Sequence, residues 1–280
     1  MFGGCHFITF CRRKLEISGN FSATYLRHRE FHRSGLAPET GAVHSWWTQF
    51  ERTTLAGLWE VGVADSKEVL GAIQDGNVEQ LRALLAEDAA LAGTRDANGV
   101  SALMLAIYQQ RKDLADALRV KLNAFDIFEA ASLGRSDLVE EMIQQKPALA
   151  NTWSGDGFTP LHFAAFFGQD SVARVLLEHH ADVSAVSKNG MKVTPLHSAA
   201  AGRHMALVRA LLENGAPVNA KQEQSWTALH AAAQNGDQYM VDLLLKYGAN
   251  PNARNDDGVT PEQLAHAKGH SEIAERLRAA

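Results

Sequence analysis

The chain has 280 residues, of which 46% are hydrophobic and 21% are charged, a composition typical of water-soluble proteins with one or two hydrophobic cores. Its formal net charge of −5 argues against a general nucleic-acid-binding protein, which usually presents a basic face. No stretch approaches the roughly 18–20 apolar residues of a membrane span, and the first residues lack the order of a secretory signal, so we expect a cytoplasmic protein.

Residues 1–62 differ from the rest of the chain, because they show no repeat and carry a net charge of +2, against −7 for the remainder. They hold both cysteines, Cys5 and Cys11, so the remainder has no disulfide framework, and the cysteine spacing matches no common zinc pattern. One interpretation is a disordered tail ending in a helix that docks on the first repeat through Trp47, Phe50, Leu55, Leu58 and Trp59. The other interpretation is translated upstream DNA, with the native start at Val63.

Three weak copies of one helical unit follow, over residues 66–95, 96–124 and 125–154. Each has a small residue at the same place in its first helix, namely Ala72, Ala106 and Ala130, and the next unit has Ala164 there. The steps between these alanines are 34, 24 and 34 residues. The short middle step predicts that one connecting finger is missing between the second and third units.

Four stronger copies cover residues 155–189, 190–223, 224–256 and 257–280. They begin with TPLHFAA at Thr159, TPLHSAA at Thr194, TALHAAA at Thr227 and TPEQLAH at Thr260, at steps of 35, 33 and 33 residues. The first three continue into a Leu-Leu pair and an Ala-Asp-like loop. This pattern resembles the ankyrin repeat, which has a period of about 33 residues and the signature T-P-L-H-x-A. The amino-acid sequence of the third to fifth units is similar to that of bacterial ankyrin proteins.

The resemblance implies an all-α fold over residues 63–280, a solenoid of helix–turn–helix units joined by β-hairpin-like fingers. Each threonine of the motif stands where a helix N-cap is wanted, and the following proline fits the first helical turn because a missing N–H costs nothing there. One unit cannot bury its apolar face alone, so the core forms by stacking. Arg203 replaces the glycine that ends the first helix in other units, and we expect it to be strained.

The histidine of the motif is structural in the ankyrin family, where it ties the threonine of its own repeat to the backbone of the next. The resemblance therefore implies structural roles for Thr159, His162, Thr194, His197, Thr227, His230 and Thr260. Stacked helices lie about 8–10 Å apart, too far for neighbouring histidines to share a zinc ion at about 2.1 Å, so we expect no metal site. No hydrolase, metalloprotease or nucleotide-binding motif occurs, and we expect neither catalysis nor a cofactor.

Partners of ankyrin proteins usually contact the finger tips and the concave face formed by the first helices. Carried over position by position, this implies a partner site at Trp153, Phe158, Phe163, Phe166, Phe167, Lys188, Met191, Lys192, Trp226, Gln234 and Asn235. The step of 35 residues adds two residues to the finger Ser187–Val193, from which Lys188, Met191 and Lys192 would protrude. Alternatively, Phe163 and Phe167 pack against the adjoining unit, and Trp226 is partly buried between fingers.

The resemblance thus implies a non-catalytic protein–protein interaction module, such as an adaptor, scaffold or regulator. It would act as a monomer on an unidentified protein partner, and bind neither nucleic acid nor membrane. Two alternatives remain open. The repeats could form the targeting or regulatory half of an enzyme or effector, or they could bind a small molecule in the concave groove.

Overall fold

A computed structural model describes residues 65–280, where all regular elements are helical apart from a single β-bridge between Arg95 and Ser101. The expected all-α fold is therefore confirmed for this part of the chain. The described residues form two compact units, one of 65–97 with 101–122, the other of 98–100 with 123–280. The expectations for residues 1–62, including the docking helix, the cysteines and the alternative start, lie outside the described residues.

The first unit contains a helical segment at 65–75, then α3 (Val78–Glu87), the short 3₁₀ helix η1 (Ala89–Gly93), α4 (Ala102–Tyr108) and α5 (Lys112–Arg119). Side-chain caps start two of these helices, since Asn77 accepts from the Gln80 N–H and Ser101 from the Met104 N–H. Helix α5 packs against both α3 and α4, and leucines of all three helices are buried. The chain here therefore folds as two helical hairpins with a shared apolar core.

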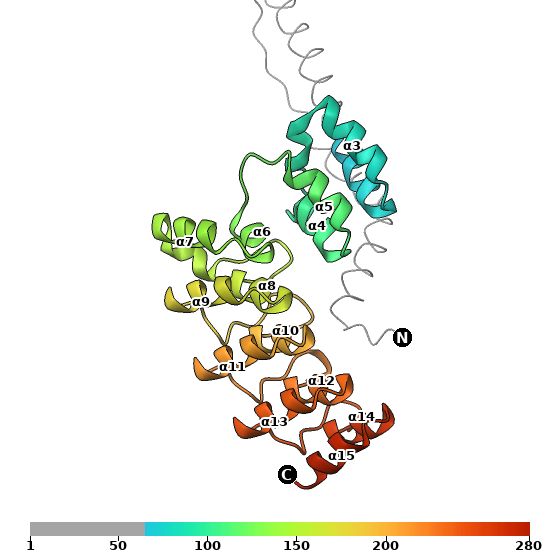
Figure 1. The fold of residues 1–280 in the computed structure, drawn as a ribbon, viewed down its shortest axis with the longest axis vertical. Helices are drawn as coiled ribbons and strands as arrows, with labels where there is room; N and C mark the ends of the chain where they lie inside the picture. The colour runs from blue at the N-terminus through green and yellow to red at the C-terminus, as the bar shows by residue number, and fades with distance from the viewer. Residues whose placement is uncertain (1–64) are drawn as a thin grey trace, which may run out of the picture. The chain divides into compact units, whose positions relative to one another are not determined.

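The second unit is built from five helical hairpins that lie one after another in Figure 1. The first helices are α6 (Ile127–Ser132), α8 (Pro160–Phe167), α10 (Pro195–Ala201), α12 (Ala228–Asn235) and α14 (Pro261–Ala267). The second helices are α7 (Ser136–Gln145), α9 (Asp170–Glu178), α11 (Met205–Glu213), α13 (Gln238–Lys246) and α15 (Ser271–Arg278). Short 3₁₀ helices, η2 (Pro147–Asn151) and η3 (Glu223–Ser225), lie in two of the connections. First helices pack on first helices and second helices on second helices, which gives two layers.

The ends of the first helices follow from the motif residues. Threonine caps the start of α8, α10, α12 and α14, and proline occupies the first turn of all but α12. Gly168 and Gly236 end α8 and α12 in the left-handed conformation. At the equivalent place after α10, Arg203 has φ +63°, so the expected backbone strain is present.

The fingers between hairpins are hairpin-like turns, in which no strand occurs among the described residues. A backbone hydrogen bond spans the base of each finger, from Ser154, Ser187, Gln222 or Asn255 to the carbonyl at its far side, at 2.8–3.1 Å. A second bond closes a turn inside the finger, such as the bond from the Gly157 N–H to the Ser154 carbonyl at 2.9 Å. Residues 120–126 connect α5 to α6 without such a finger, as the 24-residue step predicts.

Candidate partner-binding site

A buried histidine joins each strong repeat to the finger that follows it. The Thr159 N–H donates to Nδ1 of His162 at 3.2 Å, and the Thr159 hydroxyl lies 2.7 Å from the same nitrogen. Because Nδ1 accepts from a backbone N–H, the ring proton is on Nε2, which donates to the Val193 carbonyl at 3.0 Å. This single side chain therefore caps its own helix and holds the base of the next finger.

The same arrangement recurs in the next two repeats. His197 accepts from the Thr194 N–H at 3.2 Å and donates to the Ala220 carbonyl at 3.0 Å. His230 accepts from the Thr227 N–H at 3.2 Å and donates to the Val259 carbonyl at 3.2 Å. In the last repeat Gln263 replaces histidine and accepts from the Thr260 N–H at 2.9 Å, where no further finger follows. This is the structural role that the resemblance implies for these residues.

These histidines are neutral at physiological pH. Burial lowers the pKa of His162 and of His197 to about 4, and it also lowers the pKa of His230. Both ring nitrogens are already hydrogen-bonded in each case, so neither is free to bind a metal. Within residues 65–280, no three histidine, aspartate or glutamate side chains are placed to hold a metal ion together.

Backbone contacts link successive fingers into a continuous row. The Lys188 N–H donates to the Gly157 carbonyl at 2.8 Å, and Nδ2 of the Asn189 side chain donates to the Asp156 carbonyl at 2.9 Å. The row continues when the Glu223 N–H donates to the Met191 carbonyl at 2.8 Å and the Asp256 N–H to the Gln224 carbonyl at 3.0 Å. Each finger is thus positioned by its neighbour, and each of the three fingers after the first also follows a repeat whose histidine bonds to the connection.

The enlarged finger Ser187–Val193 presents two lysines to solvent. Lys188 and Lys192 are exposed, and the ammonium nitrogen of Lys188 lies 4.4 Å from the centre of the Trp153 ring, a cation–π contact. Met191 does not protrude, contrary to the expectation, because only 6% of its surface is exposed where the finger meets the next one. Lys192 has φ +51°, which is unusual for a residue other than glycine.

Two of the predicted aromatic contacts lie inside the repeat core. Phe158 and Phe163 are each 1% exposed, and their ring centres lie 5.8 Å apart in an edge-to-face arrangement. Phe128 of the preceding hairpin also contacts Phe163 edge to face, with the ring centres 5.8 Å apart. The interpretation that Phe163 packs against the adjoining unit is therefore correct. Neither ring reaches the surface, and neither can contact a partner on the folded protein.

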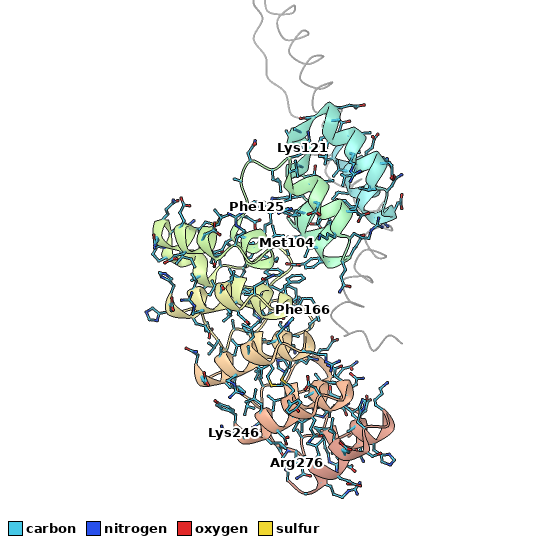
Figure 2. The ribbon with its side chains drawn as sticks, in the orientation of Figure 1. Met104, Lys121, Phe125, Phe166, Lys246 and Arg276 are labelled. Carbon is cyan, nitrogen blue, oxygen red and sulfur yellow. The ribbon has the colours of Figure 1, made fainter. Side chains whose placement is uncertain are left out.

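The remaining predicted residues are at least partly accessible. Phe166 and Phe167, at the end of α8, are half-buried and contact each other edge to face at 5.0 Å. Trp153 and Trp226 are also half-buried, each against the motif histidine of its repeat, as expected for Trp226. Gln234 and Asn235 are half-buried at the end of α12. Figure 2 labels Phe166, which belongs to α8.

Family models match two adjoining parts of the chain. Ankyrin repeats in three copies match residues 127–222, and a single ankyrin repeat matches residues 224–256. The chain contains ankyrin repeats. The match begins at α6, so it includes the hairpin that lacks the T-P-L-H motif, and the all-α repeat solenoid expected from the sequence is confirmed.

Curated relatives are similar to this chain over the ankyrin repeats. Ankyrin repeat and SAM domain-containing protein 6 of Rattus norvegicus is 36% identical over 94 residues, 30% of this chain and 11% of that protein. DNA-binding protein RFXANK of Homo sapiens is 34% identical over 80 residues, 29% of this chain and 31% of that protein. Ankyrin repeat domain-containing protein 49 of Bos taurus is 40% identical over 58 residues, 21% of this chain and 24% of that protein. The chain therefore spans less than a third of the length of each.

Ankyrin repeats generally mediate protein–protein interaction, and the proteins that carry them are generally non-catalytic. Among residues 65–280, no helix combines the length and hydropathy that a membrane crossing requires.

Sequence reasoning missed three accessible apolar side chains on the repeats, one of which is Val120, 78% exposed directly after α5. Val186 is 50% exposed directly before the enlarged finger, and Tyr239 is 77% exposed on α13. The signal for Val186 was available, since it lies just before the inserted residues of the 35-residue step.

Proposed function

We propose that this protein is a non-catalytic interaction module, an adaptor, scaffold or regulator, that binds a protein partner at the enlarged finger and the adjoining concave face. The observation that carries the proposal is the arrangement around the finger Ser187–Val193. Exposed Lys188 and Lys192, half-exposed Val186 and the partly accessible ring of Phe166 come from one hairpin and the finger that follows it. Accessible apolar side chains next to charged ones on a fixed frame match the apolar core and polar rim of protein–protein interfaces.

The frame supports this proposal because it fixes the finger before any partner arrives. The histidine bond to Val193 and the backbone bonds to Gly157 and from Glu223 hold the finger at three points. A partner that binds a preorganised surface does not have to supply the ordering entropy of a mobile loop. The strained backbone of Lys192 is the kind of local cost that persists at functional surfaces.

Site-directed photo-cross-linking tests the proposal on the full chain. A photoreactive amino acid placed at Lys192 should capture a protein partner, whereas the same amino acid at Arg174, exposed on α9, should not. The variant that combines Phe166→Ala with Lys192→Glu should then weaken the affinity for the captured partner by about tenfold or more. An Arg174→Ala variant is the matched control and should bind normally.

Three outcomes would count against the proposal. Equal capture from positions 192 and 174 would indicate non-specific contact. An unchanged affinity in the variant with Phe166→Ala and Lys192→Glu would show that the partner binds at another site. Turnover of a substrate by the purified full chain would favour the alternative that the repeats serve an enzyme or effector.

A further inference from the structure

Asparagine side chains bridge neighbouring repeats on the loop side at two junctions of the second unit. Asn151 donates from Nδ2 to the His180 carbonyl at 3.1 Å, and its Oδ1 accepts from the Asp182 N–H at 2.8 Å. The amide thus makes both bonds with the loop that follows α9. We call this pair of bonds an asparagine bridge, and it ties the hairpin α6–α7 to the hairpin α8–α9.

A second asparagine bridge ties α10–α11 to α12–α13. Asn219 donates to the Gly248 carbonyl at 3.0 Å and accepts from the Asn250 N–H at 2.8 Å. The junction between these two bridges, from α8–α9 to α10–α11, has none. Its equivalent residues are Ser184, whose side chain is too short, and Pro217, which has no N–H to donate. Within residues 65–280, no hydrogen bond joins Ser184 to residues 215–217.

A surface groove also lies at this junction. It has a volume of about 400 Å³ and runs between α9 and α11, where Ala173, Ala206 and Ala210 are among its lining residues. On α10, the hydroxyl of Ser198 is buried and has no hydrogen-bond partner among the described residues, which is costly in a well-packed interface. Arg174, which lines the groove, pairs with Glu178 of its own helix and does not reach α11.

The opposite edge of the same junction is firmly tied. His204 donates from Nε2 to the Phe166 carbonyl at 3.0 Å, and His162 donates to the Val193 carbonyl at 3.0 Å. The Lys188 N–H bond to Gly157 adds a third link on this edge. The junction therefore has hydrogen bonds along the first helices and the fingers, but not along the loops and second helices.

We infer that the repeat stack bends at the junction between α8–α9 and α10–α11, with the first helices and fingers as the axis and the loop edge as the side that opens. A junction bonded along one edge only resists sliding but not rotation about that edge. The rotation changes the curvature of the concave face, which carries Phe166 on one side of the junction and Gln234 beyond it. This inference does not depend on the proposed partner site.

Spin labels on the second helices test the inference in the full chain, with Cys5→Ser and Cys11→Ser as the background. Glu178→Cys with Glu213→Cys spans the bending junction, and Glu213→Cys with Lys246→Cys spans the next, bridged junction at equivalent positions. Dipolar broadening in continuous-wave EPR reports separations as short as those between neighbouring helices. The distance distribution of the first pair should be about twofold broader than that of the second.

Adding an asparagine bridge to the bending junction and removing it from the next junction provides matched variants. Ser184→Asn with Pro217→Asn should narrow the first distribution to the width of the second, while Asn219→Ser should broaden the second. Slowed hydrogen exchange of the new amide at position 217 shows that the bridge has formed. Equal widths in the parent protein, or a first distribution that stays broad once the bridge has formed, would overturn the inference.

Discussion

Nε2 of His162 donates a hydrogen bond to the carbonyl of Val193 at 3.0 Å, and this bond fastens one ankyrin repeat to the finger of the next. The two residues are 31 positions apart in the chain, yet both are buried. Because Nδ1 of the same ring caps its own helix, local helix formation and long-range stacking depend on one side chain. The predictions below follow from this relationship and from the burial around it.

Removal of a motif histidine should destabilise the stack. His197→Ala leaves the Thr194 N–H and the Ala220 carbonyl buried without their partner, which should cost about 2–4 kcal/mol of unfolding free energy. His197→Gln should cost less, because Gln263 shows that glutamine still caps the helix. His266→Ala, exposed on α14, is the control and should change stability by less than about 0.5 kcal/mol in urea unfolding.

Stability should fall as the pH is lowered from about 6.5 toward 4. The unfolded histidines take up a proton near pH 6.5, whereas burial holds the pKa of His162 and His197 at about 4, so protonation favours the unfolded state. Each histidine can contribute a slope of up to about 1.4 kcal/mol per pH unit in this window. Urea unfolding at pH 7, 6 and 5 measures the slope, mostly above the range where exposed carboxylates titrate. A His162→Gln, His197→Gln variant should have a smaller slope, and an equal slope would refute the assignment.

Alanine substitutions at two phenylalanines of α8 should separate an effect on stability from an effect on partner binding. Phe163→Ala removes a fully buried ring that contacts Phe128 and Phe158, and should cost about 3–5 kcal/mol. Phe166→Ala removes a half-buried ring, so it should lower the unfolding free energy by less, while still weakening the affinity for the partner. Thermal and urea unfolding of both variants checks the order. If Phe166→Ala is as destabilising as Phe163→Ala, its effect on binding cannot be assigned to direct contact.

Glycine after the first helix of a repeat should favour stability. Introducing it at Arg203 should therefore raise the stability, and removing it at Gly236 should lower the stability. Arg203→Gly relieves a left-handed residue and should stabilise by about 0.5–1 kcal/mol after the entropy cost of glycine. Gly236→Ala should destabilise by more than about 1 kcal/mol, because its φ is +70° and the added Cβ would lie 2.5 Å from the His270 ring. Gly190→Ala, where an added Cβ meets no atom within 4 Å, is the control.

Much of the fold could be read from the sequence because its signals are local. A threonine cap, a proline in the first turn and a glycine at the helix end each act within a few residues, so the helix starts at Thr159, Thr194, Thr227 and Thr260 were predictable. The site was less predictable. Sequence alone left open whether Phe163 was exposed, and wrongly placed Met191 on the surface, because their burial depends on residues of the adjoining repeats.

The sequence by itself determined the repeat period, the helix caps, the strained Arg203 and the lack of a finger between α5 and α6. Tertiary structure decided which side chains of the motif remain accessible, and that asparagine bridges form at two junctions but not at the one where Ser184 and Pro217 occupy the equivalent positions. The physical reason is distance along the chain. Caps and turns are settled among near neighbours, whereas burial and inter-repeat bonds are made between residues about thirty positions apart, which only stacking brings together.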